Sequence, residues 1–126
     1  MTAVLDASAV LAVLRREPGH QSVAEQLDGA VISAVNWSEV LQKGLARGWP
    51  ASATEALRST GVEVVAFTVQ HAARAAELWP ITSAGGLSLG DRACLALAAA
   101  TPAGVALTAD RAWGALDLPV AVQIIR

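Results

Sequence analysis

The sequence predicts a single α/β domain, in which a mostly parallel five-stranded sheet is covered by helices on both faces. The length of 126 residues allows one compact domain and is too short for two. Hydrophobic residues make up 54% of the chain, so it has enough apolar surface to bury a core. Apolar runs of strand length alternate with helical patterns, which is the order found in βα units. We therefore expect residues 1–126 to form one domain.

Five short apolar runs are predicted to be the strands. Most of them lack the polar–apolar alternation of a sheet with one solvated face, so both faces should be covered. Pro119 precedes the last run and would shorten the last strand, because proline donates no backbone hydrogen bond. The five runs are residues 3–5, 30–32, 63–66, 105–108 and 120–125.

Six helices are predicted between these strands from start and stop signals. Gly48 follows one helical pattern as a C-cap, and Pro80 is expected to end another. The stretch 82–90 is rich in Gly and Ser and is expected to be flexible. The helical patterns cover residues 9–15, 20–27, 37–47, 52–60, 69–79 and 89–100.

Charge and cysteine content exclude several classes of protein. The net charge of −2 excludes a basic nucleic-acid binder in bulk, so any RNA contact must be local or aided by metal ions. The single cysteine, Cys94, excludes an internal disulfide and a CxxC metal site. No basic segment precedes an apolar stretch at the N-terminus, and Pro102 and Gly104 break the longest uncharged run. We expect a cytoplasmic protein with no membrane contact.

Four acidic residues stand next to predicted strand ends or helix starts. Asp6 ends the first strand, and Asp110 follows the end of the fourth. Glu39 lies in the first turn of the predicted helix after the second strand, and Asp91 opens the helix before the fourth. In a parallel sheet, the carboxyl ends of the strands and the starts of the following helices share one rim. If strands one, two and four are neighbours, all four acids lie on that rim.

Such a cluster predicts a metal site. Neighbouring carboxylates in an apolar setting repel one another and are tolerated where cations neutralise them. Their oxygens suit Mg²⁺ or Mn²⁺, and these ions can activate water for the hydrolysis of a phosphodiester.

Each acid also has a purely structural interpretation as a helix cap. Asp6 stands just before the predicted helix 9–15, and Asp110 directly precedes a short predicted helix at residues 111–113; aspartate often occupies such cap positions. The other two acids lie three residues after a capping side chain, which is the spacing of a capping box. Those pairs are Asn36 with Glu39 and Ser88 with Asp91. From the residues alone, both interpretations stay open.

Four segments, each built around one of these acids, carry a family resemblance. They are residues 4–9, 33–40, 87–98 and 107–113, and the third is the most telling. In this order and spacing, over nearly the whole chain, they resemble the PIN-domain family and, within it, the VapC toxins of bacterial toxin–antitoxin pairs.

The resemblance implies a Mg²⁺- or Mn²⁺-dependent endoribonuclease. Its catalytic and metal-binding residues would be Asp6, Glu39, Asp91 and Asp110, with Asp6 and Asp91 holding the principal ion. It also implies a homodimer, RNA as the substrate, and a cognate antitoxin protein that blocks the site.

Three polar side chains beside the acids are candidates for contacts with the RNA substrate. They are Ser8, Arg92 and Thr108. Each has an alternative role, which is a local turn hydrogen bond for the two hydroxyls and a surface salt bridge for the arginine.

Two other functions stay open at this point. A PIN-like fold can serve as a catalytically silent binding module, although the full set of four acids argues against it. A phosphoryl-transfer or receiver-type domain would use Asp6 as the acceptor. However, Ser8 stands where a second acid is expected, and the only lysine, Lys43, does not follow a late strand.

Overall fold

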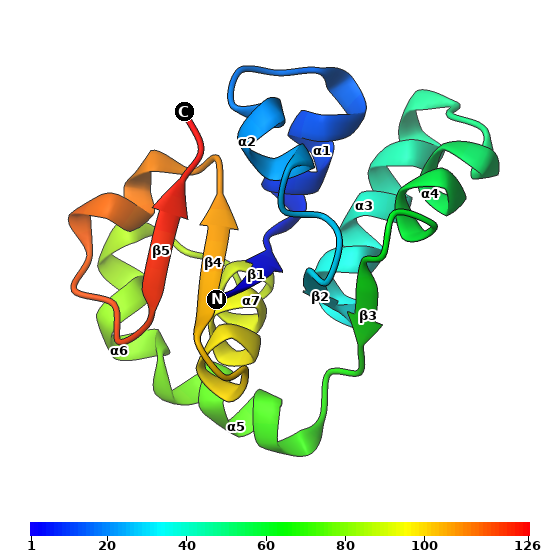
Figure 1. Ribbon diagram of the computed structural model, residues 1–126. Helices are drawn as coiled ribbons and strands as arrows, with labels where there is room; N and C mark the ends of the chain where they lie inside the picture. Colours follow the sequence, from blue (N-terminus) through cyan, green and yellow to red (C-terminus); the bar gives the residue numbers. More distant parts are fainter.

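The computed structural model describes residues 1–126 and contains one five-stranded sheet. Its strand order is β3-β2-β1-β4-β5, and every neighbouring pair is parallel (Figure 1). The predicted fold class is thus confirmed, including the adjacency of strands one, two and four. The strands are β1 (Thr2–Leu5), β2 (Val31–Ser33), β3 (Glu63–Val65), β4 (Gly104–Thr108) and β5 (Ala121–Ile124).

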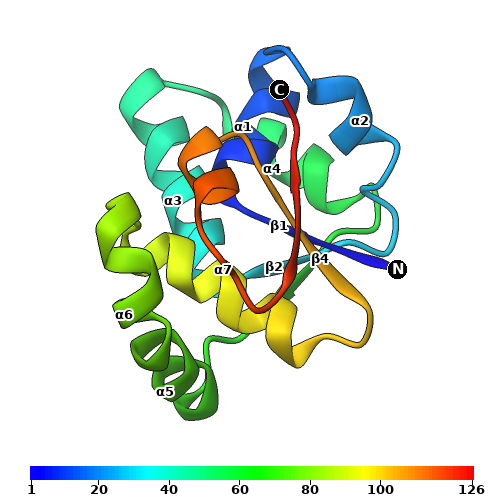
Figure 2. The ribbon, with the colours of Figure 1, turned by 90° about the vertical axis from the view of Figure 1, so that its left-hand side faces the viewer.

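Helices cover both faces of this sheet. Seven α-helices and two short 3₁₀ helices connect the strands, and Figure 2 shows α1, α2 and α4 on the opposite side of the strands from α5, α6 and α7. The helices are α1 (Ala7–Arg15), α2 (His20–Ala24), α3 (Ala34–Arg47), α4 (Ala51–Arg58), α5 (Val69–Glu77), α6 (Trp79–Thr82), η1 (Ser83–Gly85), α7 (Leu89–Ala100) and η2 (Arg111–Ala115).

The period of two in each strand divides the apolar residues between two cores. In β1, Leu5 belongs to the core beneath α1, whereas Val4 belongs to the core beneath α7. β4 repeats the division with Leu107 and Ala106. All four side chains are fully buried, which explains why the strand sequences show no polar alternation.

The strand order places a topological switch point between β1 and β4. From β1 the chain moves to β2 and β3 on one side, and it later returns to β4 on the other side. Crevices for ligands form at such points, outside the carboxyl ends of the strands. Asp6 and Asp110 follow the two strands that border this point.

One helix starts earlier than the sequence predicts. α3 begins at Ala34, directly after β2, instead of at residue 37. The Ser33 side chain caps it by accepting a hydrogen bond from the Val35 N–H at 3.2 Å. Glu39 therefore lies in the second turn of α3 and not in the first.

Pro80 begins a helix as well as ending one. α5 stops at Glu77, and α6 starts at Trp79 with the proline in its first turn, where a missing N–H does no harm. The stretch 82–90, expected to be flexible, contains the end of α6, η1 and the start of α7. None of the helices combines the length and the apolar character needed to cross a bilayer.

Candidate active site

Asp6 directly follows the last residue of β1, and only 4% of it is exposed. Its Oδ2 accepts hydrogen bonds from the Ser8 hydroxyl at 2.6 Å and from the Thr108 hydroxyl at 2.9 Å. Asp6 occupies the N-cap position of α1, but its side chain makes no capping hydrogen bond. Asp6 therefore takes the N-cap position, as the structural interpretation predicts, while the two hydroxyls hold its carboxylate.

Asp91 is fixed by a reciprocal pair of hydrogen bonds at the start of α7. The Asp91 N–H donates to Ser88 Oγ at 3.2 Å, and the Ser88 N–H donates to Asp91 Oδ2 at 2.8 Å. This capping box is the one predicted from the sequence.

Asp110 follows β4 and caps η2, as the structural interpretation predicts. Its Oδ1 accepts a hydrogen bond from the Ala112 N–H at 3.0 Å. The residue is exposed, so it stands at the outer edge of the rim.

Glu39 makes no capping box with Asn36, so that prediction is wrong. Asn36 is inside α3 and fully buried, and its Nδ2 donates to the Gly90 carbonyl oxygen at 2.9 Å. The same Nδ2 lies 3.5 Å from Glu39 Oε1. The Glu39 carboxylate lies against the first turn of α7. It is so close to Gly90 that a Cβ atom at this position would overlap Glu39 Oε1.

The four carboxylates share one arrangement. In each of them, one oxygen accepts the protein hydrogen bonds described above. The oxygens used are Asp6 Oδ2, Glu39 Oε1, Asp91 Oδ2 and Asp110 Oδ1. Each carboxylate is therefore oriented by the protein through at least one of its two oxygens.

Electrostatic repulsion links the four acids. Burial is the main cause that raises the pKa of Asp6, and the charge of Asp91 adds to it against the lowering effect of the Ser8 hydrogen bond. Burial and then the charges of Asp6 and Asp91 raise the pKa of Glu39. Burial also raises the pKa of Asp91, with a further contribution from Asp110. The carboxylates are close enough to disfavour one another's charge.

The residues fit a hard divalent cation in their chemistry. No three acidic, histidine or cysteine side chains converge closely enough in the structure to form a finished metal site. The donor set nevertheless consists of oxygens only, which suits Mg²⁺ or Mn²⁺, and each acid has an oxygen to offer. Burial is the largest cause of the raised pKa of Asp6, Glu39 and Asp91, and repulsion between the carboxylates adds to it, so a bound cation would favour their charged forms.

The three candidates for RNA contact each have a partner within the protein. Thr108 is fully buried and donates to Asp6, and Ser8 also accepts a hydrogen bond from the Ala109 N–H at 2.9 Å. Arg92 donates through Nη1 to the Ala75 carbonyl oxygen of α5 at 2.9 Å. Contact between these residues and RNA stays a prediction.

Sequence reasoning missed two residues that contact Glu39. Asn36 lies three residues before Glu39, which is the spacing of a capping box. The sequence therefore suggested a cap and gave no indication that Asn36 contacts α7. Gly90 carried a usable signal, because an isolated glycine in a helical pattern is less favourable than alanine and so suggests a packing reason.

Comparison with known proteins agrees with this architecture. A family model described as PIN domain matches residues 3–118. No curated protein sequence matches the chain.

Three solved structures share the fold. A chain of a toxin–antitoxin complex from Klebsiella pneumoniae superposes with a TM-score of 0.76 at 19% identity, covering 98% of each chain. DNA-bound VapBC from Salmonella typhimurium gives a TM-score of 0.74 at 14% identity, covering 98% of this chain and 97% of that one. VapBC2 from Rickettsia felis, bound to a promoter DNA fragment, gives a TM-score of 0.68 at 16% identity, covering 98% of each chain.

The family match spans most of the sequence and includes most of β1, all of β2 to β4, the helices and the four acids, but not β5. The resemblance drawn from the sequence is thereby confirmed, and the chain belongs to the PIN-domain family.

Proposed function

We propose that this protein is a metal-dependent endoribonuclease and the toxin of a bacterial toxin–antitoxin pair. One observation carries the proposal: Asp6, Glu39, Asp91 and Asp110 lie near enough to one another for the charge of one to raise the pKa of a neighbour, and Asp6 and Asp110 follow the two strands that border the switch point. Membership of the PIN-domain family and the shared fold with toxin–antitoxin complexes support it.

In this proposal the four acids have two different roles, which depend on how firmly the protein orients each carboxylate. Asp6 and Asp91 would hold the principal Mg²⁺ or Mn²⁺, because they are the most firmly oriented of the four. Such an ion, when bound, supplies positive charge beside the phosphodiester and makes a nearby water more acidic. Asp110 and Glu39 would complete the site and orient the attacking water.

The reaction proposed is a simple hydrolysis. The water oxygen forms a bond to phosphorus while the bond between phosphorus and the 3′ oxygen breaks. One proton leaves the water and one is taken up by the 3′ oxygen, so the products end in a 5′-phosphate and a 3′-hydroxyl. Ser8 and Thr108 act in this scheme by holding Asp6 Oδ2.

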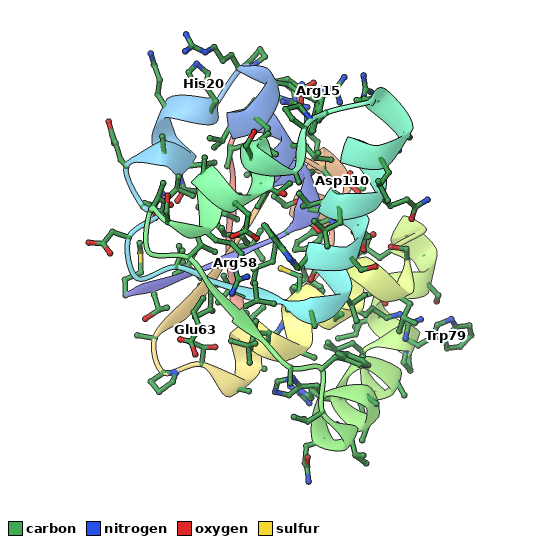
Figure 3. The ribbon with its side chains drawn as sticks, turned by 90° about the vertical axis from the view of Figure 1, so that its right-hand side faces the viewer. Arg15, His20, Arg58, Glu63, Trp79 and Asp110 are labelled. Atoms are coloured by element: carbon green, nitrogen blue, oxygen red, sulfur yellow. The ribbon has the colours of Figure 1, made fainter.

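The experiment is the cleavage of total RNA by the purified chain with Mg²⁺, with Mn²⁺ and with EDTA. Asp6→Asn and Asp91→Asn should remove cleavage and leave the fold intact. Glu63→Gln is the matched control, because this exposed acid begins β3 and lies at the other end of the sheet from Asp110 (Figure 3). Discrete metal-dependent fragments that persist in Asp91→Asn would refute the assignment. If wild type binds no Mn²⁺ and leaves RNA intact, the silent binding module is the better description.

A protein partner is part of the proposal. Leu45 on α3 is 83% exposed and Trp79 on α6 is 58% exposed, and Figure 3 shows Trp79 projecting outward from the molecule. A cognate antitoxin or a second copy of the chain would cover such apolar surface. Light scattering on the chain purified alone tests the homodimer, because a monomeric mass would exclude it.

A further inference from the structure

We propose that Asn36 and Gly90 are positioning residues that set the place of Glu39 against Asp91. Asn36 ties the helix that carries Glu39 to the helix that carries Asp91, and Gly90 leaves open the space that the Glu39 carboxylate occupies. The inference rests on the proposed function, because the position of Glu39 matters only if the acidic rim is a working site.

Asn36 connects the two helices through a single amide group. Its Nδ2 donates at 2.9 Å to the carbonyl oxygen of Gly90, which lies 54 residues further along the chain, and approaches Glu39 Oε1 at 3.5 Å. The Asn36 Oδ1 is buried and has no partner. An unpartnered buried oxygen costs stability, which an apolar side chain at this position would avoid. Apolar packing therefore does not account for an asparagine here, whereas its hydrogen bond to the Gly90 carbonyl and its approach to Glu39 do.

Gly90 is needed for space and not for its backbone conformation. It is the second residue of α7, where the backbone is helical and where alanine would be the better helix former. A Cβ at this position would overlap Glu39 Oε1 and would lie 2.9 Å from the Glu39 Cδ. The glycine thus lets the carboxylate reach the N-terminal turn of a 12-residue helix, whose partial positive charge favours it.

The substitution Gly90→Ala tests whether Gly90 sets the position of the Glu39 carboxylate, and it removes no hydrogen bond. The clash falls on the far end of a flexible glutamate side chain, so Glu39 should move aside while the fold persists. We expect Mn²⁺ affinity, measured by the EPR signal of free Mn²⁺, to fall on the order of tenfold, as changes around metal ligands do. RNA cleavage should fall in parallel.

A matched control is available within α3. Gly44 is also a helical glycine, but a Cβ there would meet its nearest atom, Trp49 Cε3, at an ordinary contact distance of 3.5 Å. Gly44→Ala should leave Mn²⁺ affinity at the wild-type value.

Asn36→Ala tests the other half of the proposal, with Thr82→Val as its control. Thr82 is likewise fully buried and donates to a backbone carbonyl, that of Leu78 at 2.8 Å, but it does so outside the rim. Both variants should lose stability in thermal unfolding without metal. Only Asn36→Ala should also weaken Mn²⁺ binding.

Repeating the measurements in a Glu39→Ala background separates positioning from general damage. If Asn36 and Gly90 act through Glu39, then Asn36→Ala and Gly90→Ala change Mn²⁺ affinity in the wild type and have no further effect in Glu39→Ala. Equal losses in both backgrounds, or wild-type affinity in Gly90→Ala, would overturn the proposal. If the wild type binds no Mn²⁺, both the proposed function and this inference are overturned. The wild type is measured first, so this outcome is known before any positioning variant is compared.

Discussion

The hydroxyl of Thr108, at the end of β4, donates a hydrogen bond of 2.9 Å to Oδ2 of Asp6, at the end of β1. Both residues are buried, so the Asp6 carboxylate has little access to water. The Thr108 hydroxyl is one of the two hydroxyl groups that donate to it. It also joins the two strands that border the switch point of the sheet.

Thr108→Val should therefore destabilise the protein more than loss of an ordinary threonine hydrogen bond. A hydrogen bond to a charged group contributes about 1.5–3 kcal/mol, whereas a neutral one contributes about 0.5–1.5 kcal/mol. Thr101→Val is the comparison, because the Thr101 hydroxyl donates to the neutral carbonyl of Leu97 at 2.7 Å. Urea denaturation at neutral pH measures both losses. Equal losses would show that the charge on Asp6 adds nothing to the bond.

The metal-free protein should become less stable as the pH rises above the ordinary range of carboxylates. The pKa values of Asp6, Glu39 and Asp91 are raised in the folded state above 3.8 for aspartate and 4.5 for glutamate. Between these ordinary values and the raised ones, the folded state binds more protons than the unfolded state. Its free energy of unfolding therefore falls through that window and is highest on the acid side.

Denaturant titrations across this pH range, with EDTA present, measure the slope. Asp6→Asn should flatten it, because the variant removes one of the repelling charges, whereas Glu63→Gln should leave it as in wild type. A stability that rises steadily with pH in wild type would contradict the repulsion described for the rim.

If the proposed metal site is present, Mn²⁺ should stabilise the wild-type fold, because it would bind the folded rim and would have no comparable site in the unfolded chain. At a free concentration of a hundred times the dissociation constant, the gain is about 2.7 kcal/mol. Thermal unfolding with and without Mn²⁺ measures it, and EDTA should reverse it. An equal rise in melting temperature for Asp91→Asn would place the bound ion elsewhere.

Ser88→Ala should separate the capping role of Asp91 from its proposed chemistry. The substitution removes the Oγ that accepts the Asp91 N–H, at a cost of about 1 kcal/mol. The Ser88 N–H still donates to Asp91 Oδ2, so the carboxylate stays oriented. We expect a lower midpoint in denaturant with Mn²⁺ binding close to that of wild type. Loss of Mn²⁺ binding as severe as in Asp91→Asn would show that the cap hydroxyl itself belongs to the site.

The sequence predicted most of the fold because its signals are local. The strands of this sheet are buried on both faces, and so they appear as short runs without alternation, as around Leu5 and Leu107. Ser88 with Asp91 is a local pair, and the capping box formed as predicted. The rim followed from topology, since parallel strands place their carboxyl ends together.

The contacts of Asn36 could not be read in the same way. The spacing between Asn36 and Glu39 matches a cap, and only the fold reveals that Ser33 already serves as the cap. The true partner of Asn36 lies on α7, far along the chain, so no local pattern records the contact. The same holds for the use of Ser8 and Thr108 by Asp6, which requires β1 and β4 to be paired.

The pairing of β1 with β4 also decides when the rim comes into existence during synthesis. Asp6 is made before Thr108, which donates to it and lies 102 residues further along the chain. A ribosome-bound or prematurely terminated chain that ends before β4 carries three of the four acids and cannot assemble them. During synthesis the four acids can therefore come together only after β4 has emerged and paired with β1.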